Sequence, residues 1–219
     1  MDPTSPAPKK ISLKKAALVI VDLQRDFMPQ GAWELPNSEA VVAMANRFQR
    51  SFRLVVATQD WHPKSHKIFA SNHDKREIGQ VISFKRQVFK LTVVHCVQKT
   101  IGAELAPALI RDYIQKIFYR GQDSDLNGQS AFFDNDGRTS TGLTEFLRAR
   151  AITKVYIMGF SPDGCVEKTA LQAQSLGFEA HLIEDAIRTG QLTDEERQET
   201  ERAIKAAGIH RVTSSDLLL

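Results

Sequence analysis

The sequence predicts one doubly wound α/β domain, in which a mainly parallel six-stranded sheet is covered by helices on both faces. Continuous apolar runs with β propensity alternate along the chain with amphipathic helical stretches, a pattern typical of parallel sheets buried on both faces. The 219 residues are also enough for a single domain to bury a full core without disulfides or structural metals.

The predicted strands are short apolar runs that recur at intervals along the chain. They are Ala16–Val21, Leu54–Ala57, Leu91–His95, Lys116–Tyr119, Val155–Gly159, His181–Ile183 and His210–Thr213. The predicted helices lie between most of these runs and show helical spacing of their apolar residues. They are Ser38–Ser51, Ala103–Tyr113, Thr141–Arg150, Cys165–Leu176 and Asp194–Ala207. Gly177 and Gly208 stand where two of the helices should end.

We expect residues 1–12 to form a disordered tail and residues 13–219 to form the domain. The first ten residues, MDPTSPAPKK, are rich in proline and lack the apolar core of a signal peptide. No run approaches the length of a membrane span. The two cysteines have no framework spacing, which favours free thiols in a reducing compartment. These observations predict a cytoplasmic protein.

The charge pattern narrows the range of partners. The formal net charge is +3, and no segment has the dense lysine and arginine patch typical of nucleic-acid binding. We therefore expect neither a nucleic acid nor a membrane as partner, but a small molecule. The sequence leaves open whether the chain forms a homo-oligomer.

Polar residues with reactive or metal-binding side chains follow the predicted strands. They are Asp22, Asp60 with His62, His95, Arg120 and Cys165. In doubly wound folds the carboxyl ends of the strands meet at one edge of the sheet, and ligands bind there. The sequence therefore predicts that these side chains form one site.

Cys165 is placed on the first turn of a predicted helix, with Asp163 as its N-cap. The positive end of the helix dipole favours a thiolate at such a position, so Cys165 is a candidate nucleophile. The alternative is a buried cysteine that acts as a small apolar residue, which is what most cysteines are. Cys96, inside an apolar run, is interpreted in that way.

Asp22 and Arg120 are each open to two interpretations. Asp22 is either a cap for the loop that follows its strand or the base that takes a proton from Cys165 and passes it to a leaving group. Arg120 is either a surface residue paired with Asp123 or Asp125, or a fixed cation near Cys165 and Asp22.

Asp60, His62 and His95 form a candidate site for a divalent transition metal. The spacing of Asp60 and His62 puts both side chains on one side of an extended chain. One carboxylate and two imidazoles suit Zn²⁺ and leave coordination positions for water. His66 is a further candidate as a ligand or as a supporting residue. The other histidines, His73, His181 and His210, are interpreted as structural.

Five motifs, in this order, resemble the nicotinamidase branch of the isochorismatase-like cysteine hydrolases. They are VDLQRDF (21–27), TQDWHPKSHKIFASNH (58–73), HCVQKTIGAEL (95–105), GQSAFFDND (128–136) and GFSPDGCVEKTALQA (159–173). The resemblance implies a Rossmann-like three-layer fold. It also implies hydrolysis of nicotinamide, or of amides such as pyrazinamide, to the acid and ammonia, a step in NAD salvage.

The resemblance assigns roles to individual residues. The family's nucleophile falls on Cys165, its aspartate on Asp22, and its catalytic lysine on Arg120. Its metal ligands fall on Asp60, His62 and His95, where zinc, iron or manganese would hold the pyridine nitrogen. The amides of Ser161 and Cys165 would form the oxyanion hole, with a cis peptide between Phe160 and Ser161. The implied substrate-binding residues are Phe27, Trp61, Thr92, Phe160 and Gly164.

The chain departs from the family pattern at three positions. Arg120 stands in place of lysine, Thr92 in place of a tryptophan, and Gly164 in place of an aromatic or branched residue. Loss of an aromatic wall should weaken stacking on a flat pyridine ring. The variant Arg120→Lys restores the family residue and is expected to keep or raise activity.

Two alternatives therefore remain open. One is a related hydrolase that acts on another substrate. The other is a protein that retains the metal and the pocket but binds a ligand without turnover.

Overall fold

The computed structural model describes residues 13–190 and 192–217. The predicted tail, residues 1–12, lies outside this range. No helix in the described part of the chain is long and apolar enough to cross a membrane.

The centre of the molecule is the predicted six-stranded sheet, in the order β5-β2-β1-β6-β7-β8. Its strands are β1 (Ala16–Val21), β2 (Leu54–Asp60), β5 (Ile114–Arg120), β6 (Lys154–Ser161), β7 (Glu179–Thr189) and β8 (His210–Val212). Every neighbouring pair is parallel. Along the chain, β2 and β5 are added on one side of β1, and β6, β7 and β8 are then added on its other side. The β1–β6 boundary is therefore a topological switch point, where doubly wound folds bind ligands.

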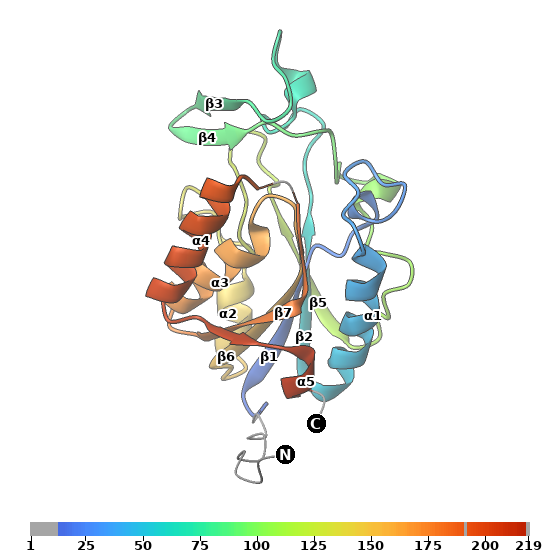
Figure 1. Ribbon diagram of the computed structural model, residues 1–219, viewed down its shortest axis with the longest axis vertical. Coiled ribbons are helices and arrows are strands. Elements are labelled where there is room, and N and C mark those ends of the chain that lie inside the picture. The colour runs from blue at the N-terminus through green and yellow to red at the C-terminus, as the bar shows by residue number, and fades with distance from the viewer. Residues whose placement is uncertain (1–12, 191, 218–219) are drawn as a thin grey trace, which may run out of the picture.

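Helices cover both faces of the sheet, as predicted. Helix α1 (Ser38–Phe48) and the short α5 (Ser214–Leu217) pack on one face, and α2 (Leu143–Arg148), α3 (Cys165–Ser175) and α4 (Asp194–Ala206) pack on the other (Figure 1). Alternate residues of β1 divide between these layers. Leu18 and Ile20 contact the α1 side, whereas Val19 and Val21 contact the α3 side. This division is why the strand is apolar at every position rather than at every second one.

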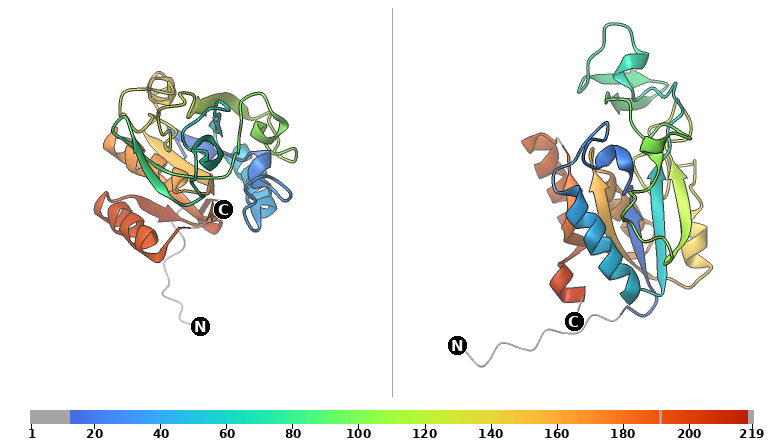
Figure 2. Two further views of the ribbon diagram at one scale, coloured as in Figure 1. Left: turned by 90° about the horizontal axis from the view of Figure 1, so that it is seen from above. Right: turned by 90° about the vertical axis from the view of Figure 1, so that its right-hand side faces the viewer.

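The prediction of a sheet strand at Leu91–His95 is wrong. The preceding residues form an antiparallel hairpin, β3 (Val81–Phe84) and β4 (Gln87–Lys90), and residues 91–95 are irregular. Leu91 packs with Phe69 and Phe89 in a small separate cluster, so its apolar character reflects that cluster and not the sheet. The hairpin lies beyond the carboxyl ends of the strands (Figures 1 and 2). Cys96 is buried in the core as predicted, although it lies in a loop.

The predicted helix at Ala103–Tyr113 is also wrong. The segment contains only the end of a 3-10 turn, η4 (Ile101–Ala103), and is otherwise irregular. Pro107 lacks an amide hydrogen and disfavours a helical conformation in the residue before it. Leu105 and Leu109 are still buried, so the apolar spacing identified core residues but not their conformation.

Gly159 is required where β6 passes β1. Its φ is +131°, and a Cβ added there would lie 2.1 Å from the carbonyl oxygen of Val21. We expect Gly159→Ala to reduce the free energy of unfolding by at least about 2 kcal/mol, measured by urea denaturation. Gly137→Ala is the matched control, because its φ is +67° but no atom lies within 4 Å of the added Cβ. Equal losses in the two variants would contradict this explanation.

Candidate active site

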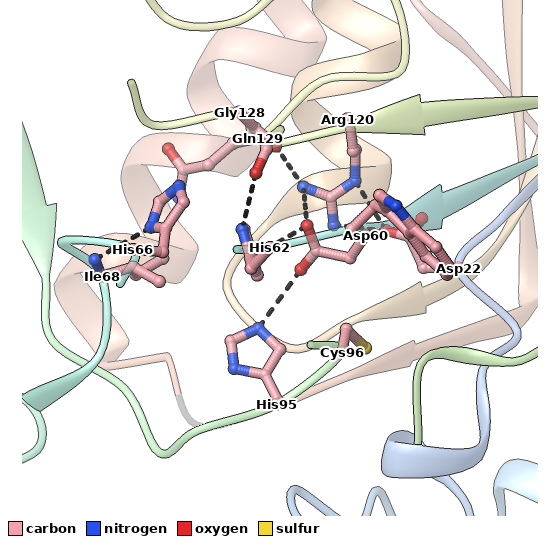
Figure 3. Close-up of polar contacts among 12 residues, drawn as sticks. Asp22, Asp60, His62, His66, Ile68, His95, Cys96, Arg120, Gly128 and Gln129 are labelled. Carbon is pink, nitrogen blue, oxygen red and sulfur yellow. Dashed lines mark hydrogen bonds and ion pairs between the residues drawn. The ribbon is translucent and has the colours of Figure 1, made fainter. Parts of the chain in front are cut away.

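The structure brings the predicted site residues together at the carboxyl edge of the sheet, and Figure 3 shows all of them except Cys165. They are no more than 3% exposed and comprise Asp22, Asp60, His62, His95, Arg120 and Cys165. They come from the ends of β1, β2 and β5, the start of α3 and the loop after the hairpin. Segments far apart in sequence therefore form one cluster of polar groups, enclosed by the core.

Asp60, His62 and His95 form a compact candidate metal site. One ligand atom from each residue lies within 4.8 Å of the others. Asp60 ends β2, and its carboxylate faces both imidazoles, with Oδ1 2.9 Å from Nε2 of His62 and Oδ2 3.2 Å from Nε2 of His95. The fold therefore brings together the three residues that the sequence predicted as metal ligands.

Backbone carbonyls orient both imidazoles. Nδ1 of His62 lies 3.0 Å from the carbonyl oxygen of Gly121, and Nδ1 of His95 lies 2.9 Å from that of Val93. An Nδ1–H that donates to these carbonyls leaves the Nε2 lone pair free to bind a metal. Oδ1 of Asp60 and Nε2 of His62 are buried without a hydrogen-bond partner of suitable geometry. Such unsatisfied atoms fit a site built for a divalent cation.

Asp60 is held in its ionised form. Burial raises its pKa, but Arg120, His62 and the hydrogen bond with His95 together lower it by more, so the pKa lies well below its ordinary value. A carboxylate that remains charged when buried is the form that a metal ion binds.

His66 does not belong to the metal group. Its Nδ1 accepts a hydrogen bond from the amide of Ile68, and its Nε2 lies 3.0 Å from the carbonyl oxygen of Leu126. Burial lowers its pKa to about 3, so the ring is neutral. Its ring centroid lies 4.2 Å from that of His62. Both nitrogens are already hydrogen-bonded, so His66 packs against a ligand rather than acting as one.

Arg120 connects the metal group to Cys165. Its guanidinium donates to Oδ2 of Asp22 through Nε at 2.9 Å and also through Nη2. Nη2 lies 3.1 Å from Sγ of Cys165, and Nη1 donates to the carbonyl oxygen of Gly128. Nη1 also lies 3.4 Å from Oδ1 of Asp60. Arg120 is therefore a buried cation and not a surface residue paired with Asp123 or Asp125.

Asp22 lies just beyond β1 with a left-handed backbone (φ 52°). Its Oδ1 accepts a hydrogen bond from Oγ1 of Thr58 at 2.6 Å, and Arg120 occupies its Oδ2. Burial and the charge of Asp60 together raise the pKa of Asp22 by more than Arg120 and Thr58 lower it. A carboxyl group that binds protons more readily than usual suits acid–base work.

Cys165 is the first residue of α3, as predicted, but Asp163 does not cap that helix. The N-cap is Gly164, with φ +93° and no side-chain cap. Asp163 instead accepts a hydrogen bond from the thiol, at 2.6 Å between Sγ and Oδ1. Burial raises the pKa of Cys165 well above its ordinary value, although Arg120 opposes the shift. The site therefore holds the protonated thiol, whereas the helix dipole alone would favour the thiolate.

A cavity of about 560 Å³ opens beside these groups. Trp33, Thr92 and Asp163 line it, and they contact His95 or Cys165 directly. Of the five predicted substrate-binding residues, Thr92 lines this cavity. The other four, Phe27, Trp61, Phe160 and Gly164, are not among the lining residues in the described part of the chain. Phe27 lies behind the wall, with its ring centroid 5.7 Å from that of His95.

The predicted oxyanion groups lie at the end of β6 and the start of α3. As the first residue of a helix, Cys165 has an amide without an intrahelical acceptor. The Ser161 hydroxyl donates to Glu167 and accepts from the amide of Val166 at 3.2 Å. The described residues contain no cis peptide bond, so the predicted cis link between Phe160 and Ser161 is absent.

Two residues at the site were missed at the sequence level. The buried side chain of Gln24 donates to the carbonyl oxygen of Asp60 and accepts from its amide, both at 2.8 Å, which fixes the end of β2. Trp33 packs edge-on against His95, with 4.9 Å between ring centroids. Gln24 lies within the motif VDLQRDF, and its position directly after a strand was the available signal. Trp33 lies in a turn and gave no comparable signal.

The contacts of Arg120 change the expectation for Arg120→Lys. A lysine has one nitrogen and cannot reach the two carboxylates, the thiol and the carbonyl oxygen at once. We expect kcat/KM of this variant for a cleaved amide to fall by about tenfold or more, because a buried carboxylate would lose a partner. The comparison of steady-state kinetics in the wild type and the variant tests this. Activity at or above that of the wild type would show that a single charge is sufficient.

Comparisons with known proteins agree with this geometry. A family model described as the isochorismatase domain matches residues 16–216. The nicotinamidase of Acinetobacter baylyi is 35% identical over 203 residues, covering 93% of this chain and 94% of that protein. The structure of a nicotinamidase/pyrazinamidase from Acinetobacter baumanii has a TM-score of 0.88 at 34% identity, covering 93% of this chain and 98% of that chain. A pyrazinamidase of Pyrococcus horikoshii, solved with zinc, has a TM-score of 0.70 at 32% identity, covering 91% and 99%.

Proposed function

The chain belongs to the isochorismatase family, and from this premise we propose that it is a metal-dependent nicotinamidase that converts nicotinamide to nicotinate and ammonia in NAD salvage. One observation carries the proposal. Arg120 joins three groups in one cluster. They are the cysteine at the start of α3, the buried aspartate with which Arg120 pairs, and the Asp–His–His group. A nucleophile and a candidate metal site in such contact suit an amidase that both orients and cleaves its substrate.

Cys165 supplies the nucleophile. Its sulfur attacks the amide carbon, and the amide hydrogens at the start of α3 stabilise the negative charge that develops on the oxygen. Ser161, at the end of β6, contributes the second amide. Arg120, 3.1 Å from Sγ, stabilises the sulfur as it becomes negative without giving up a proton.

Asp22 moves protons at the reacting amide. It takes the thiol proton as the sulfur attacks and passes this proton to the departing nitrogen, which leaves as ammonia and produces a thioester on Cys165. The resulting carboxylate takes a proton from the water that attacks the thioester and returns it to the sulfur when the C–S bond breaks. Its hydrogen bonds with Thr58 and Arg120 keep the group in one orientation for both steps.

Asp60, His62 and His95 would hold a divalent ion, and the donor set of one carboxylate and two imidazoles suits zinc, with iron or manganese as alternatives. When bound, the ion supplies a Lewis acid for the ring nitrogen of the substrate. Gly121 and Val93 fix the imidazole orientations through their carbonyl oxygens.

The substrate class is small aromatic amides, with nicotinamide first and pyrazinamide-like amides second. Thr92 and Trp33 line the cavity where a flat ring would lie. A single indole and a threonine provide less stacking surface than two aromatic walls, so ring recognition depends on the metal and on Trp33.

Ammonia release from nicotinamide by the purified protein tests the proposal, with metal content measured on the same sample. We expect stoichiometric ammonia and nicotinate and about one metal ion for each chain, because the described residues contain one such donor set. A folded, metal-loaded protein that releases no ammonia from nicotinamide or pyrazinamide would exclude a nicotinamidase. The remaining choices would then be a hydrolase for another substrate and a protein that binds without turnover.

A further inference from the structure

The β3–β4 hairpin carries apolar side chains on both of its faces. Val81 and Val88 lie on one face, as the antiparallel register requires. Ile82 and Phe89 lie on the opposite face and pack in the small cluster with Phe69. Packing within the protein therefore accounts for the second face but not for the first.

The first face borders the cavity beside the site. Val81 is 62% exposed and Val88 is 59% exposed, and Ile78, which precedes β3, is 61% exposed. All three side chains line the cavity of about 560 Å³, and we call them the apolar wall. Exposed apolar side chains that gather in a cavity are typical of a surface that a ligand covers.

The same cavity reaches the candidate metal site. Thr92 and Trp33 line it at that end, and both contact the imidazole of His95. Oγ1 of Thr92 lies 3.4 Å from Nδ1 of His95, and the ring centroid of Trp33 lies 4.9 Å from that of His95. Because the side chain of Thr92 is small, the cavity runs past it from His95 to the apolar wall.

An ion pair holds the hairpin against α4. Nζ of Lys90, at the end of β4, lies 2.7 Å and 2.8 Å from the two carboxylate oxygens of Glu196 in α4. Both residues line the cavity, and Figure 1 shows the hairpin above α4. The apolar wall is thus held in place before a ligand binds, which lowers the entropic cost of binding.

The cavity is larger than nicotinamide requires. Volumes of about 300–1,000 Å³ are typical of sites for drug-sized ligands. Nicotinamide is a single aromatic ring with one amide group, so it fills only part of a cavity of about 560 Å³. A substrate that also covers the apolar wall carries a further group.

The lining residues indicate which part of the substrate carries this group. The cavity meets the site beside His95, one of the residues that would hold the metal at the ring nitrogen. Asp22, which serves the leaving nitrogen, is fully buried and is not among the lining residues in the described part of the chain. A substituent on the ring can therefore extend into the cavity, whereas a substituent on the amide nitrogen faces Asp22 and the core.

We propose that the apolar wall is a substrate subsite for amides whose aromatic ring carries an apolar substituent, and that Thr92 determines this specificity. The inference rests on the proposed amidase function and leaves the reaction unchanged. Water cleaves the C–N bond and gives the substituted acid and ammonia. Position 5 of the pyridine ring is the position for the substituent, because that carbon is adjacent to neither the ring nitrogen nor the carbon that bears the amide.

The comparison of 5-propylnicotinamide with nicotinamide tests the proposal in the full-length, metal-loaded protein. We expect kcat/KM, measured by ammonia release, to be about tenfold higher for the propyl amide, because its carbons are partly buried against the apolar wall. N-propylnicotinamide should be a poorer substrate than nicotinamide. A preference for 5-propylnicotinamide below about threefold would overturn the proposal, and so would a higher kcat/KM for the N-propyl amide than for the 5-propyl amide.

Ile78→Asn and Ile101→Asn are matched variants for the apolar wall. Both isoleucines are exposed, at 61% and 69%, but Ile101 is not among the cavity-lining residues in the described structure. The ratio of kcat/KM for 5-propylnicotinamide to that for nicotinamide should fall about fivefold in Ile78→Asn. The ratio should stay within about twofold of the wild-type value in Ile101→Asn. Equal ratios in the two variants would contradict the assignment of the wall.

Thr92→Trp tests the specificity residue. The indole would fill the passage between His95 and the apolar wall, so the same ratio should fall by about 30-fold or more and 5-propylnicotinamide should become the poorer substrate. The ratio is the readout, because Thr92 also contacts His95 and its replacement acts on both amides. A wild-type ratio in this variant would show that Thr92 does not determine specificity.

Binding of the product acids separates this inference from the proposed function, because it requires no turnover. Isothermal titration calorimetry of the wild-type, metal-loaded protein should give a Kd for 5-propylnicotinate about tenfold lower than that for nicotinate. If neither amide releases ammonia, the proposed function fails, while tighter binding of the propyl acid still supports the subsite. If both amides are cleaved but the two acids bind equally, the function stands and the subsite is excluded.

Discussion

Cys165→Ala is expected to abolish amide hydrolysis while the fold and the metal site remain. Removal of a covalent nucleophile commonly costs about 10⁴-fold or more in kcat, because no other group can form the acyl intermediate. The change is small in volume and leaves the imidazoles of His62 and His95 with their carbonyl partners. Ammonia release and metal content, measured on the same preparation, provide both readouts.

Cys96→Ala is the matched control, because Cys96 is the other buried thiol and packs in the core on the α1 side. It should lose some stability and keep its activity. Substantial ammonia release by Cys165→Ala, or equal losses in the two variants, would rule out Cys165 as the nucleophile.

His95→Ala is expected to remove both the metal and the activity. His95 supplies one of three ligands, and its loss leaves an aspartate and a single imidazole. We expect metal affinity to fall by more than about 100-fold, because even supporting residues of such sites contribute up to that factor. Metal content after dialysis and ammonia release with added zinc measure the effect.

His73→Ala is the matched histidine control, because its Nε2 bonds only to the carbonyl oxygen of Lys67 in the described structure. It should keep its metal and its activity. A His95→Ala protein that still hydrolysed nicotinamide at the rate of the wild type would show that the reaction does not depend on this site.

Local pattern was sufficient to predict the six strands of the main sheet and most of the helices. The run Ala16–Val21 is apolar throughout because both faces of β1 are covered, and such runs are visible in any window of the sequence. The prediction failed at Ala103–Tyr113 and at Leu91–His95, where apolar residues are buried in irregular segments. Apolar residues at regular spacing indicate burial as well as a helix or a strand. Whether a buried segment is regular or irregular depends on the tertiary packing around it.

The sequence by itself determined which residues would meet, because parallel strands bring their carboxyl ends to one edge and the reactive side chains follow those ends. The tertiary structure alone decided how they meet. Arg120 and Asp22 are 98 positions apart and Arg120 and Cys165 are 45 apart, so their contacts depend on how the layers pack. Asp163 shows the difference most clearly. Its position before a helix suggested a cap, but the left-handed Gly164 turns the chain so that its carboxylate faces the thiol instead.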